Sequence, residues 1–320
     1  MIDVAVNIFA KPFQTALSLL SLLERCGQHV GTIWLQFEPV GSKHDPVTAY
    51  HIADWLREQL GDARVRVSQP EYWLDLNAAD PQRLGDAAYR MGIRYQHAFE
   101  NSSSDRLFLM HNDVFVLKDI LGDMANAMGD AFAIGQLGQC WNCPASNEAL
   151  MRDAAGRAPC TPASYEQFQP DFATLRTLYA QAHARGVFAR PYDDAFAGEF
   201  DVQPWPLPEC RINEWACLIN LKAVQSRCIP RGPALSPGAY RQCGPVCLDI
   251  GVTWFRQMHA LGMRARHFDV KGHMRHWVGT GKNTPRRYAL AEDNALRLLQ
   301  RHYPQWLVWL KGRTGKDFTR

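Results

Sequence analysis

The segment Arg106-Leu-Phe-Leu-Met-His-Asn-Asp-Val-Phe-Val116 joins an apolar run to a polar triplet, and this combination indicates a fold class and a candidate site. Residues 107–110 are apolar without alternation, which is typical of a strand buried on both faces in the middle of a parallel sheet. The triplet His111-Asn112-Asp113 follows at the carboxyl end, where open α/β sheets bind their ligands. Asp113 is therefore the first candidate site residue, although Asn112-Asp113 also fits an ordinary turn.

Three strand-and-helix units precede this segment. The expected strands are apolar, β-branched runs at residues 2–9, 30–37 and 65–67. The expected helices have apolar residues at helical spacing within residues 13–23, 52–60 and 84–98. Such alternation predicts an α/β fold with a mostly parallel sheet flanked by helices. We expect the strand ends at Lys11, Glu38 and Asp113 to share one edge of that sheet.

The second half of the chain is less regular. Residues 138–210 are rich in proline and hold four cysteines, and we interpret them as an insertion. Strand-like sequence returns at residues 214–221, and a helix is expected from residue 249. Residues 288–310 are expected to form a final helix with a break at Pro304.

The composition limits the classes of function. A net charge of +3 over 320 residues gives no sign of nucleic-acid binding. No stretch approaches the roughly 20 apolar residues that span a bilayer. The start, Met1-Ile-Asp-Val-Ala-Val6, lacks the features of a signal peptide, so we expect a cytoplasmic protein. Nine cysteines, an odd number, then favour reduced thiols or a metal site over a disulfide framework.

The first strand is not followed by either of the two commonest phosphate-binding loops. Its continuation, Ala10-Lys11-Pro12, matches neither Gly-x-Gly-x-x-Gly nor Gly-Lys-Ser/Thr. If the chain binds phosphate, another group has to neutralise it, and a metal ion on Asp113 is the natural candidate.

Seven short segments recur, in the same order, in a known family. They are Val4-Ala-Val-Asn-Ile-Phe-Ala-Lys-Pro12, Ile33-Trp-Leu-Gln-Phe-Glu38, Ala88-Tyr-Arg-Met-Gly-Ile93, Leu107-Phe-Leu-Met-His-Asn-Asp-Val114, Trp215-Ala-Cys-Leu-Ile-Asn220, Leu248-Asp-Ile-Gly-Val-Thr-Trp-Phe-Arg256 and Arg275-His276-Trp277. Together they resemble the motifs of GT-A nucleotide-sugar glycosyltransferases, in particular the family 2-like group, from residue 2 to about residue 280. The fourth segment resembles a Leu-Asn-Asn-Asp-Val form of the metal-binding Asp-x-Asp motif. Leu248 stands where the family has Glu, and His111 where an acidic residue is frequent.

The resemblance implies an enzyme that transfers a sugar, with inversion, from a nucleotide diphosphate sugar to an acceptor hydroxyl. Glycan or cell-surface polysaccharide synthesis would be its setting, with a glycan, a lipid-linked molecule or another hydroxyl compound as acceptor. It also implies one GT-A-like domain over residues 1–320. Its expected parts are a nucleotide-binding half (1–129), an acceptor half (130–280) that carries the insertion, and a helical tail (281–320).

The expected metal is Mn²⁺ or Mg²⁺, bound to neutralise the departing diphosphate. The resemblance makes Asp113 the first ligand and His276 the second, with His111 as a weaker contributor. His273, three residues before His276, competes for the same role.

Two further roles follow from the resemblance. Asp249 is the expected general base for the acceptor hydroxyl, although it also fits a helix N-cap. The residues expected to contact the donor are Lys11, Glu38, Arg90, His111 and Asn112. Glu38 would accept hydrogen bonds from the ribose or base, and Arg90 would pair with phosphate, but each also fits an ordinary solvated charge.

The insertion and the tail each allow a second interpretation. Cys140-Trp-Asn-Cys143 has the spacing of half a zinc site, and Cys160 and Cys210 would complete a structural Zn²⁺ site, with Cys243 and Cys247 as further candidates. Scattered reduced thiols explain the same cysteines. The tail holds Trp306, Trp309, Lys311, Arg313 and Lys316, which fit a peripheral contact with the inner face of a membrane or ordinary packing on the domain.

Two other functions remain open from the sequence. One is a non-catalytic GT-A-like protein whose cysteine insertion forms a zinc-stabilised interaction surface. The other is a nucleotidyltransferase, which shares an α/β nucleotide-binding half but normally carries a Gly-rich basic loop after its first strand.

Overall fold

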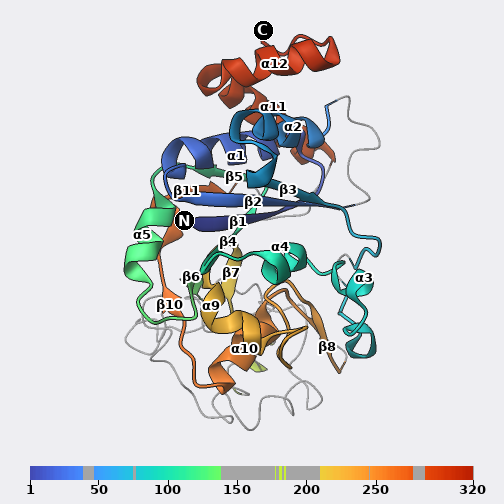
Figure 1. The fold of residues 1–320 in the computed structure, drawn as a ribbon, viewed down its shortest axis with the longest axis vertical. Helices are drawn as coiled ribbons and strands as arrows, with labels where there is room; N and C mark the ends of the chain where they lie inside the picture. Colours follow the sequence, from blue (N-terminus) through green and yellow to red (C-terminus); the bar gives the residue numbers. More distant parts are fainter. Residues whose placement is uncertain are drawn as a thin grey trace.

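The computed structural model describes residues 1–38, 47–74, 77–137, 210–244, 246–276 and 285–319, with residues 177, 180, 181 and 184 in addition. A central sheet is built on strands in the order β10-β6-β7-β4-β1-β2-β3 (Figure 1). In chain order the main elements are β1 (Ile2–Ile8), α1 (Pro12–Cys26), β2 (Val30–Phe37), α2 (Tyr50–Leu60), β3 (Val65–Ser68), α3 (Ala87–Arg90), α4 (Gln96–Asn101), β4 (Arg106–His111), β5 (Val114–Val116), α5 (Ile120–Ala127), β6 (Ala133–Leu137), β7 (Ile212–Asn220), α9 (Leu221–Val224), β8 (Arg241–Cys243), β9 (Val246–Leu248), α10 (Val252–Ala260), β10 (Arg266–His267), β11 (Met274–His276), α11 (Pro285–His302) and α12 (Pro304–Thr314).

The first half confirms the predicted α/β fold with a mostly parallel sheet. β1 pairs in parallel with β2 and with β4, so that Ile8 lies beside Phe37 and Asn7 beside His111. Because parallel strands end at the same edge, Lys11, Glu38 and Asp113, which follow β1, β2 and β4, lie at one edge of the sheet, as the sequence predicted. Helices α1 and α2 lie on one face of this sheet, and α4, α9 and α10 lie towards the other (Figure 1).

Strand β4 is buried on both faces. Phe108 and Met110 belong to an apolar cluster that includes α1 and α2, whereas Leu107 and Leu109 belong to a second cluster that includes α4 and α10. Each of the four side chains is at most 1% exposed. The unbroken apolar run therefore reflects a central strand with helices on both sides.

Strand β7 departs from the parallel pattern. It lies between β4 and β6 and is antiparallel to both. The sequence predicted a strand here. A buried strand has the same apolar pattern whether it runs parallel or antiparallel to its neighbours, so the pattern does not indicate its direction.

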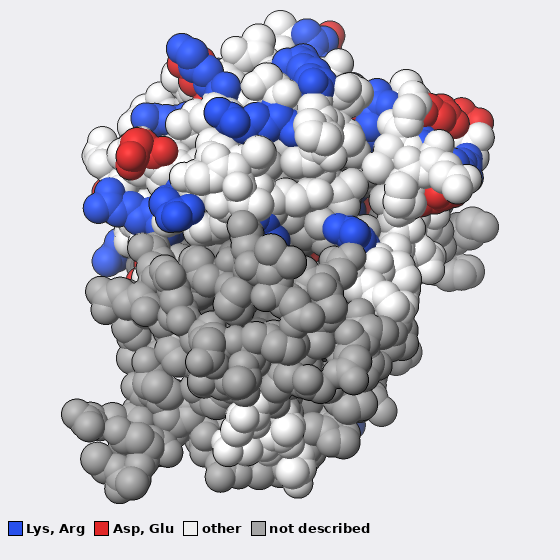
Figure 2. All heavy atoms as spheres, turned by 90° about the horizontal axis from the view of Figure 1, so that it is seen from below, with Lys and Arg blue, Asp and Glu red and all other residues white. Residues whose placement is uncertain are grey.

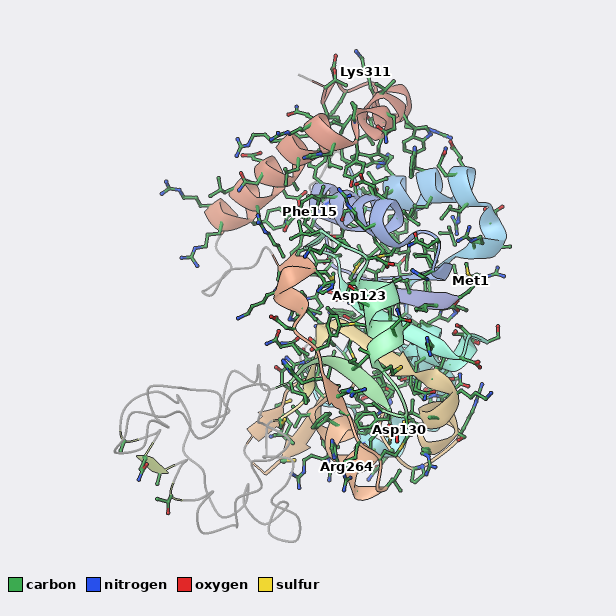
Figure 3. All side chains as sticks on the ribbon, turned by 90° about the vertical axis from the view of Figure 1, so that its left-hand side faces the viewer. Met1, Phe115, Asp123, Asp130, Arg264 and Lys311 are labelled. Carbon is green, nitrogen blue, oxygen red and sulfur yellow. The ribbon has the colours of Figure 1, made fainter. Side chains whose placement is uncertain are left out.

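A small two-stranded sheet joins distant parts of the chain. β5 follows Asp113 directly and pairs antiparallel with β11, so that Val114 lies opposite His276. Phe115 of β5 lies beneath the C-terminal helices, with its ring centroid 6.4 Å from that of His302 (Figure 3). This pairing brings His276 to the end of β4.

The helix expected over residues 84–98 is two short helices, α3 and α4. Gly92 lies between them, and a Cβ there would be 2.6 Å from the carbonyl oxygen of Tyr72. Tyr95, which precedes α4, has a left-handed backbone with φ of 62°. A close backbone approach and a left-handed residue both interrupt a helix, which is why the apolar spacing alone overestimated its length.

The tail forms α11 and α12, separated at Pro304 as predicted. Trp306 is 1% exposed, and Trp309 donates a hydrogen bond to Glu58 of α2 at 2.7 Å. The two tryptophans thus pack on the domain, which was one of the two interpretations. Within the described part of the chain, no helix combines the length and the apolar character that a membrane crossing requires. The face seen in Figure 2 carries basic side chains interspersed with acidic and uncharged ones.

Candidate metal centre and its polar chain

His111, Asp113 and His276 bring three potential metal-binding atoms together at the carboxyl edge of the sheet. His276 Nε2 lies 3.1 Å from Asp113 Oδ1 and 3.1 Å from His111 Nδ1, and His111 Nδ1 lies 3.8 Å from Asp113 Oδ1. Within the ranges that the structure describes, this is the one group of three or more such residues. His273, the competing histidine, instead contacts Asp123 of α5 at 2.8 Å.

The separations fit one metal ion. Donor atoms bound at about 2.1 Å and at right angles to one another are about 3 Å apart, and wider angles give somewhat longer separations. The three observed separations between potential ligand atoms lie in this range. Two imidazole nitrogens and one carboxylate oxygen suit Mn²⁺, Zn²⁺ or another transition metal better than Mg²⁺, which prefers oxygen.

The cluster has a rigid surround. Asn112 is 5% exposed, and its amide donates to Thr15 Oγ1 at 2.9 Å and to the carbonyl of Ala10 at 3.3 Å. The ring of Trp215 on β7 stacks on His276, with centroids 5.2 Å apart and planes 11° from parallel. Asn112 thus ties the end of β4 to the turn after β1, and Trp215 fixes the plane of one imidazole.

Asp113 is an ionised carboxylate in a buried place. Its side chain is 3% exposed, and burial by itself raises the pKa of the carboxyl. The hydrogen bond with His276 and the charge of Lys11 outweigh burial and hold the pKa of Asp113 well below its usual range. Lys11 Nζ is 2.7 Å from Asp113 Oδ2, so the two carboxylate oxygens have different partners.

A chain of polar contacts leads from the cluster to Asp249. Glu214 Oε1 is 3.3 Å from His111 Nε2, and the other oxygen of Glu214 binds the guanidinium of Arg211. Arg211 also donates to Asp249 Oδ2 at 2.9 Å and to the carbonyl of Ile250 at 2.8 Å. Arg211 and Glu214 are both buried, whereas the Asp249 side chain is 34% exposed.

The contact with Glu214 fixes which ring nitrogen of His111 carries the proton. An ionised carboxylate only accepts hydrogen bonds, so His111 Nε2 carries the proton that this contact uses. In the neutral imidazole the lone pair is then on Nδ1, which points to Asp113 and His276. A carboxylate behind a histidine is a common arrangement at metal sites, where it fixes the ring and its tautomer.

Sequence reasoning missed Arg211 and Glu214. A signal was present, because two opposite charges three residues apart stand in and beside an otherwise apolar strand. Charged residues are rarely buried unless they are paired. Their partners His111 and Asp249 are 103 and 38 positions away, which spacing cannot reveal.

Acid is expected to weaken the fold through Glu214. Burial raises the pKa of its carboxyl, but the charge of Arg211 and the hydrogen bond with His111 outweigh it and lower the pKa to about 2 from an ordinary value of 4.5. Because the folded pKa is the lower one, the ionised group stabilises the fold above pH 4.5, and this contribution disappears as the pH falls towards 2. Its size is on the order of 3 kcal/mol.

Urea unfolding between pH 7 and pH 3 measures this contribution. Glu214→Gln should be less stable than wild type at pH 7 and should lose less stability on acidification. Equal pH slopes for the two proteins would contradict the assignment.

The other predicted donor-contact residues lie in different surroundings. Glu38 is 6% exposed and accepts a hydrogen bond from the side-chain amide of Asn7, and the guanidinium of Arg94 lies 3.5 Å from its carboxylate. Arg90 is paired with Glu100, with Nε to Oε1 at 2.5 Å, and donates to the carbonyl of Leu84. The observed contacts of Arg90 are therefore structural, and its contact with phosphate stays a prediction.

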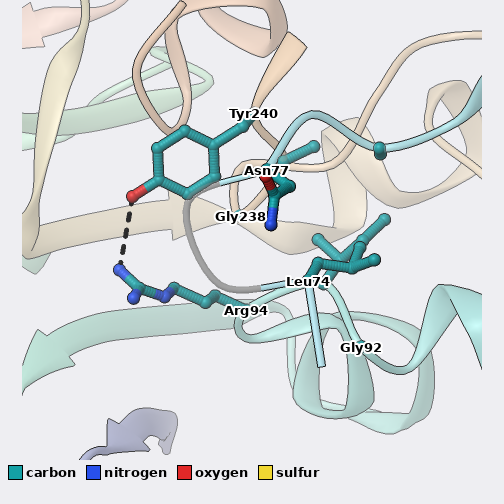
Figure 4. A pocket seen from close by; sticks show the side chains of 9 residues that line it. Leu74, Asn77, Gly92, Arg94, Gly238 and Tyr240 are labelled. Carbon is teal, nitrogen blue, oxygen red and sulfur yellow. Dashed lines mark hydrogen bonds between the residues drawn. The ribbon is translucent and has the colours of Figure 1, made fainter. Parts of the chain in front are cut away.

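Arg94 borders a small pocket near Glu38. Tyr240 lies across from it, and their hydroxyl and guanidinium groups are 3.4 Å apart (Figure 4). The remaining lining residues are Leu74, Asn77, Ala79, Gly92, Ile93, Gly238 and Ala239. Sequence reasoning did not single out Arg94 or Tyr240.

Most cysteines of the predicted zinc site lie outside the residues that the structure describes. Cys140, Cys143 and Cys160 lie outside the described residues, and Cys210 is buried in an apolar cluster. The described cysteines are not in disulfide bonds. Cys243 is buried and Cys247 is partly exposed. Burial raises the pKa of the Cys228 thiol to about 12, so this thiol is unreactive at neutral pH.

No protein-family model matches the chain, and a search of curated proteins finds no match either. Solved structures give similarities of fold. A mannosyltransferase from Pyrobaculum calidifontis, solved with GDP-Man and Mn²⁺, is 9% identical, with 98% of this chain and 79% of that chain covered and a TM-score of 0.41. Glucosyl-3-phosphoglycerate synthase from Mycobacterium tuberculosis, solved with Mn²⁺, UDP and phosphoglyceric acid, is 11% identical, with 94% and 78% covered and a TM-score of 0.39.

A third similar structure is TarS of S. aureus. It is 16% identical, the match covers 42% of this chain, and the TM-score is 0.29. This chain spans only 21% of the length of TarS. At these identities and TM-scores the likenesses concern the fold alone, and function has to be argued from the residues of this chain.

Proposed function

We propose that this chain is a metal-dependent glycosyltransferase, which moves a sugar from a nucleoside-diphosphate sugar to an acceptor hydroxyl. The observation that carries the proposal is the group of His111, Asp113 and His276, which lies at the edge where parallel strands β1, β2 and β4 end. This edge is where open α/β sheets bind nucleotides. The motif resemblance of Asp113 supports the same assignment.

The residues present fit a divalent transition-metal ion, and we propose Mn²⁺. Asp113 Oδ1, His111 Nδ1 and His276 Nε2 would hold it, with Glu214 fixing the ring of His111. The bound ion would supply positive charge to the departing diphosphate. Lys11, whose ammonium group lies on the far oxygen of Asp113, adds a second positive charge beside the same place.

Asp249 is the proposed general base. Its Oδ2 is fixed by Arg211, and its Oδ1 accepts a hydrogen bond from the amide of Ile250 at 2.8 Å. Helix α10 begins at Val252, and its N-cap residue is Gly251 rather than Asp249. A carboxylate that is 34% exposed and held in one orientation can accept the proton of an acceptor hydroxyl, and attack by that hydroxyl inverts the anomeric centre.

Nucleotide binding that depends on the metal tests the proposal. Calorimetry with UDP and GDP should show binding that Mn²⁺ strengthens, and a radiolabelled nucleotide sugar should be consumed only when Mn²⁺ is present. His276→Ala should weaken Mn²⁺ binding by about tenfold or more, since it removes one ligand of three. His273→Ala is the matched control, because His273 also contacts an aspartate but lies outside the cluster. If neither nucleotide binds, with or without Mn²⁺, the proposal is wrong.

A further inference from the structure

Lys11 and the candidate metal site share one carboxylate. Lys11 Nζ is 2.7 Å from Asp113 Oδ2, while Asp113 Oδ1 faces the two imidazoles. The side chains of Lys11 and Asp113 are 17% and 3% exposed, so little water screens this contact. The only carboxylate among the three potential ligands is therefore already neutralised by a cation of the chain itself.

The backbone around Lys11 is fixed. Ala10 and Lys11 both have left-handed φ values, 47° and 56°, which are unfavourable for residues other than glycine. The amide of Lys11 donates to the hydroxyl of Tyr288 on α11 at 3.1 Å, and its carbonyl accepts from Thr15 Oγ1 at 2.6 Å. This surround distinguishes Lys11 from an ordinary mobile surface lysine.

The helix that follows is also held by α11. The first amides of α1, those of Phe13 and Gln14, donate to the carboxylate of Glu292 at 2.9 and 3.2 Å. Side-chain oxygens at a helix start stabilise it by satisfying such free amides, and here the oxygens come from Glu292 of α11. The backbone of the turn that carries Lys11 is thus held by two residues of α11, Tyr288 and Glu292.

We propose that Lys11 is an internal counter-cation that makes metal binding depend on the nucleoside diphosphate. This inference rests on the function proposed above. A divalent ion at Asp113 Oδ1 would lie a few ångströms from the ammonium of Lys11, and the two positive charges repel each other. A diphosphate brings negative charge to both cations and offsets this repulsion. By linkage, the diphosphate and the ion each bind more tightly when the other is present.

Manganese titrations of the full chain with and without UDP or GDP test the proposal. Wild type should bind Mn²⁺ alone weakly and about tenfold or more tightly with the diphosphate. Lys11→Met keeps the length of the side chain but removes its charge. It should bind Mn²⁺ alone about tenfold or more tightly than wild type, and its gain in Mn²⁺ affinity from the diphosphate should be smaller than that of wild type. Lys222→Met, at an exposed position of α9, is the charge-matched control and should behave as wild type.

Each outcome bears on one of the two proposals. If Lys11→Met binds Mn²⁺ no more tightly than wild type, or if neither protein binds Mn²⁺, the counter-cation inference is overturned. If Lys11→Met gains Mn²⁺ affinity but no protein binds UDP or GDP, Lys11 repels the ion, but the dependence on a diphosphate and the proposed function both fail. If wild type binds the diphosphate with Mn²⁺ but Lys11→Met gains no Mn²⁺ affinity, the proposed function stands and only the counter-cation inference fails. Tyr288→Phe, which removes the contact to the Lys11 amide, should shift Mn²⁺ affinity in the same direction by a smaller factor. If Lys11→Met does not fold, Tyr288→Phe provides the test in its place.

Discussion

Asp113→Asn is expected to remove detectable Mn²⁺ binding and to lower the rate of sugar transfer by a factor of at least about 10³. Asparagine keeps the shape of the side chain but not its charge. The cluster would then consist of two imidazoles beside the ammonium of Lys11, which repels a divalent ion. Manganese binding followed by electron paramagnetic resonance and single-turnover transfer from a nucleotide sugar measure the two effects.

Asp123→Asn is the matched control for this change. Asp123 also forms an aspartate–histidine contact, to His273 at 2.8 Å, but its side chain is 58% exposed and lies outside the cluster. It should retain wild-type metal binding and transfer. If Asp113→Asn keeps more than about a tenth of the wild-type rate while Asp123→Asn is normal, Asp113 is not a metal ligand that the reaction needs.

Asp249→Asn is expected to lower turnover by a factor of about 10³ while nucleotide and Mn²⁺ binding stay close to wild type. The amide oxygen of asparagine can still accept the hydrogen bond from Arg211, so the local structure should persist, but an amide cannot take a proton from the acceptor. Pre-steady-state transfer and calorimetry separate the two properties. The anomeric configuration of the product, followed by nuclear magnetic resonance, gives an independent test, because a general base at this position requires inversion.

Two results would count against Asp249 as the base. One is a turnover that falls by less than about tenfold in Asp249→Asn. The other is a product with retained configuration. A parallel loss of nucleotide binding would instead indicate that Asp249 acts on the donor, through Arg211 and Glu214.

The fold could be predicted from the sequence because buried apolar residues recur at spacings typical of strands and helices. The apolar run of β4, the alternation of the first strands and helices, and the polar ends of three strands were enough to predict a mostly parallel sheet and its edge. The sequence predicts that Lys11 and Asp113, 102 positions apart, share that edge, and their side chains lie 2.7 Å apart. The resemblance favours His276 over the competing His273, and the pairing of β5 with β11 is what places His276 in the cluster.

Other features of the structure are not reflected in the spacing of apolar residues. The direction of β7 depends on its partners, and the division of residues 84–98 depends on the approach of one carbonyl oxygen to Gly92. Arg90 matched a motif position, yet the partner that binds it most closely, Glu100, lies on the next helix of the fold. Arg211 and Glu214 act through residues far along the chain. Such pairings are set by tertiary packing, which a single sequence does not encode in local spacing.

The contribution of α11 to the start of α1 has a consequence for synthesis on the ribosome. The candidate site is assembled from β4, near the first third of the chain, and from β11, and the turn that carries Lys11 is held by Tyr288 and Glu292. These contacts join residues 163 and 277–279 positions apart, so they close late and slowly compared with the local βα units. A growing chain can therefore form most of its sheet while the site is still open, and we expect the turn that carries Lys11 to be held only after α11 has left the ribosome.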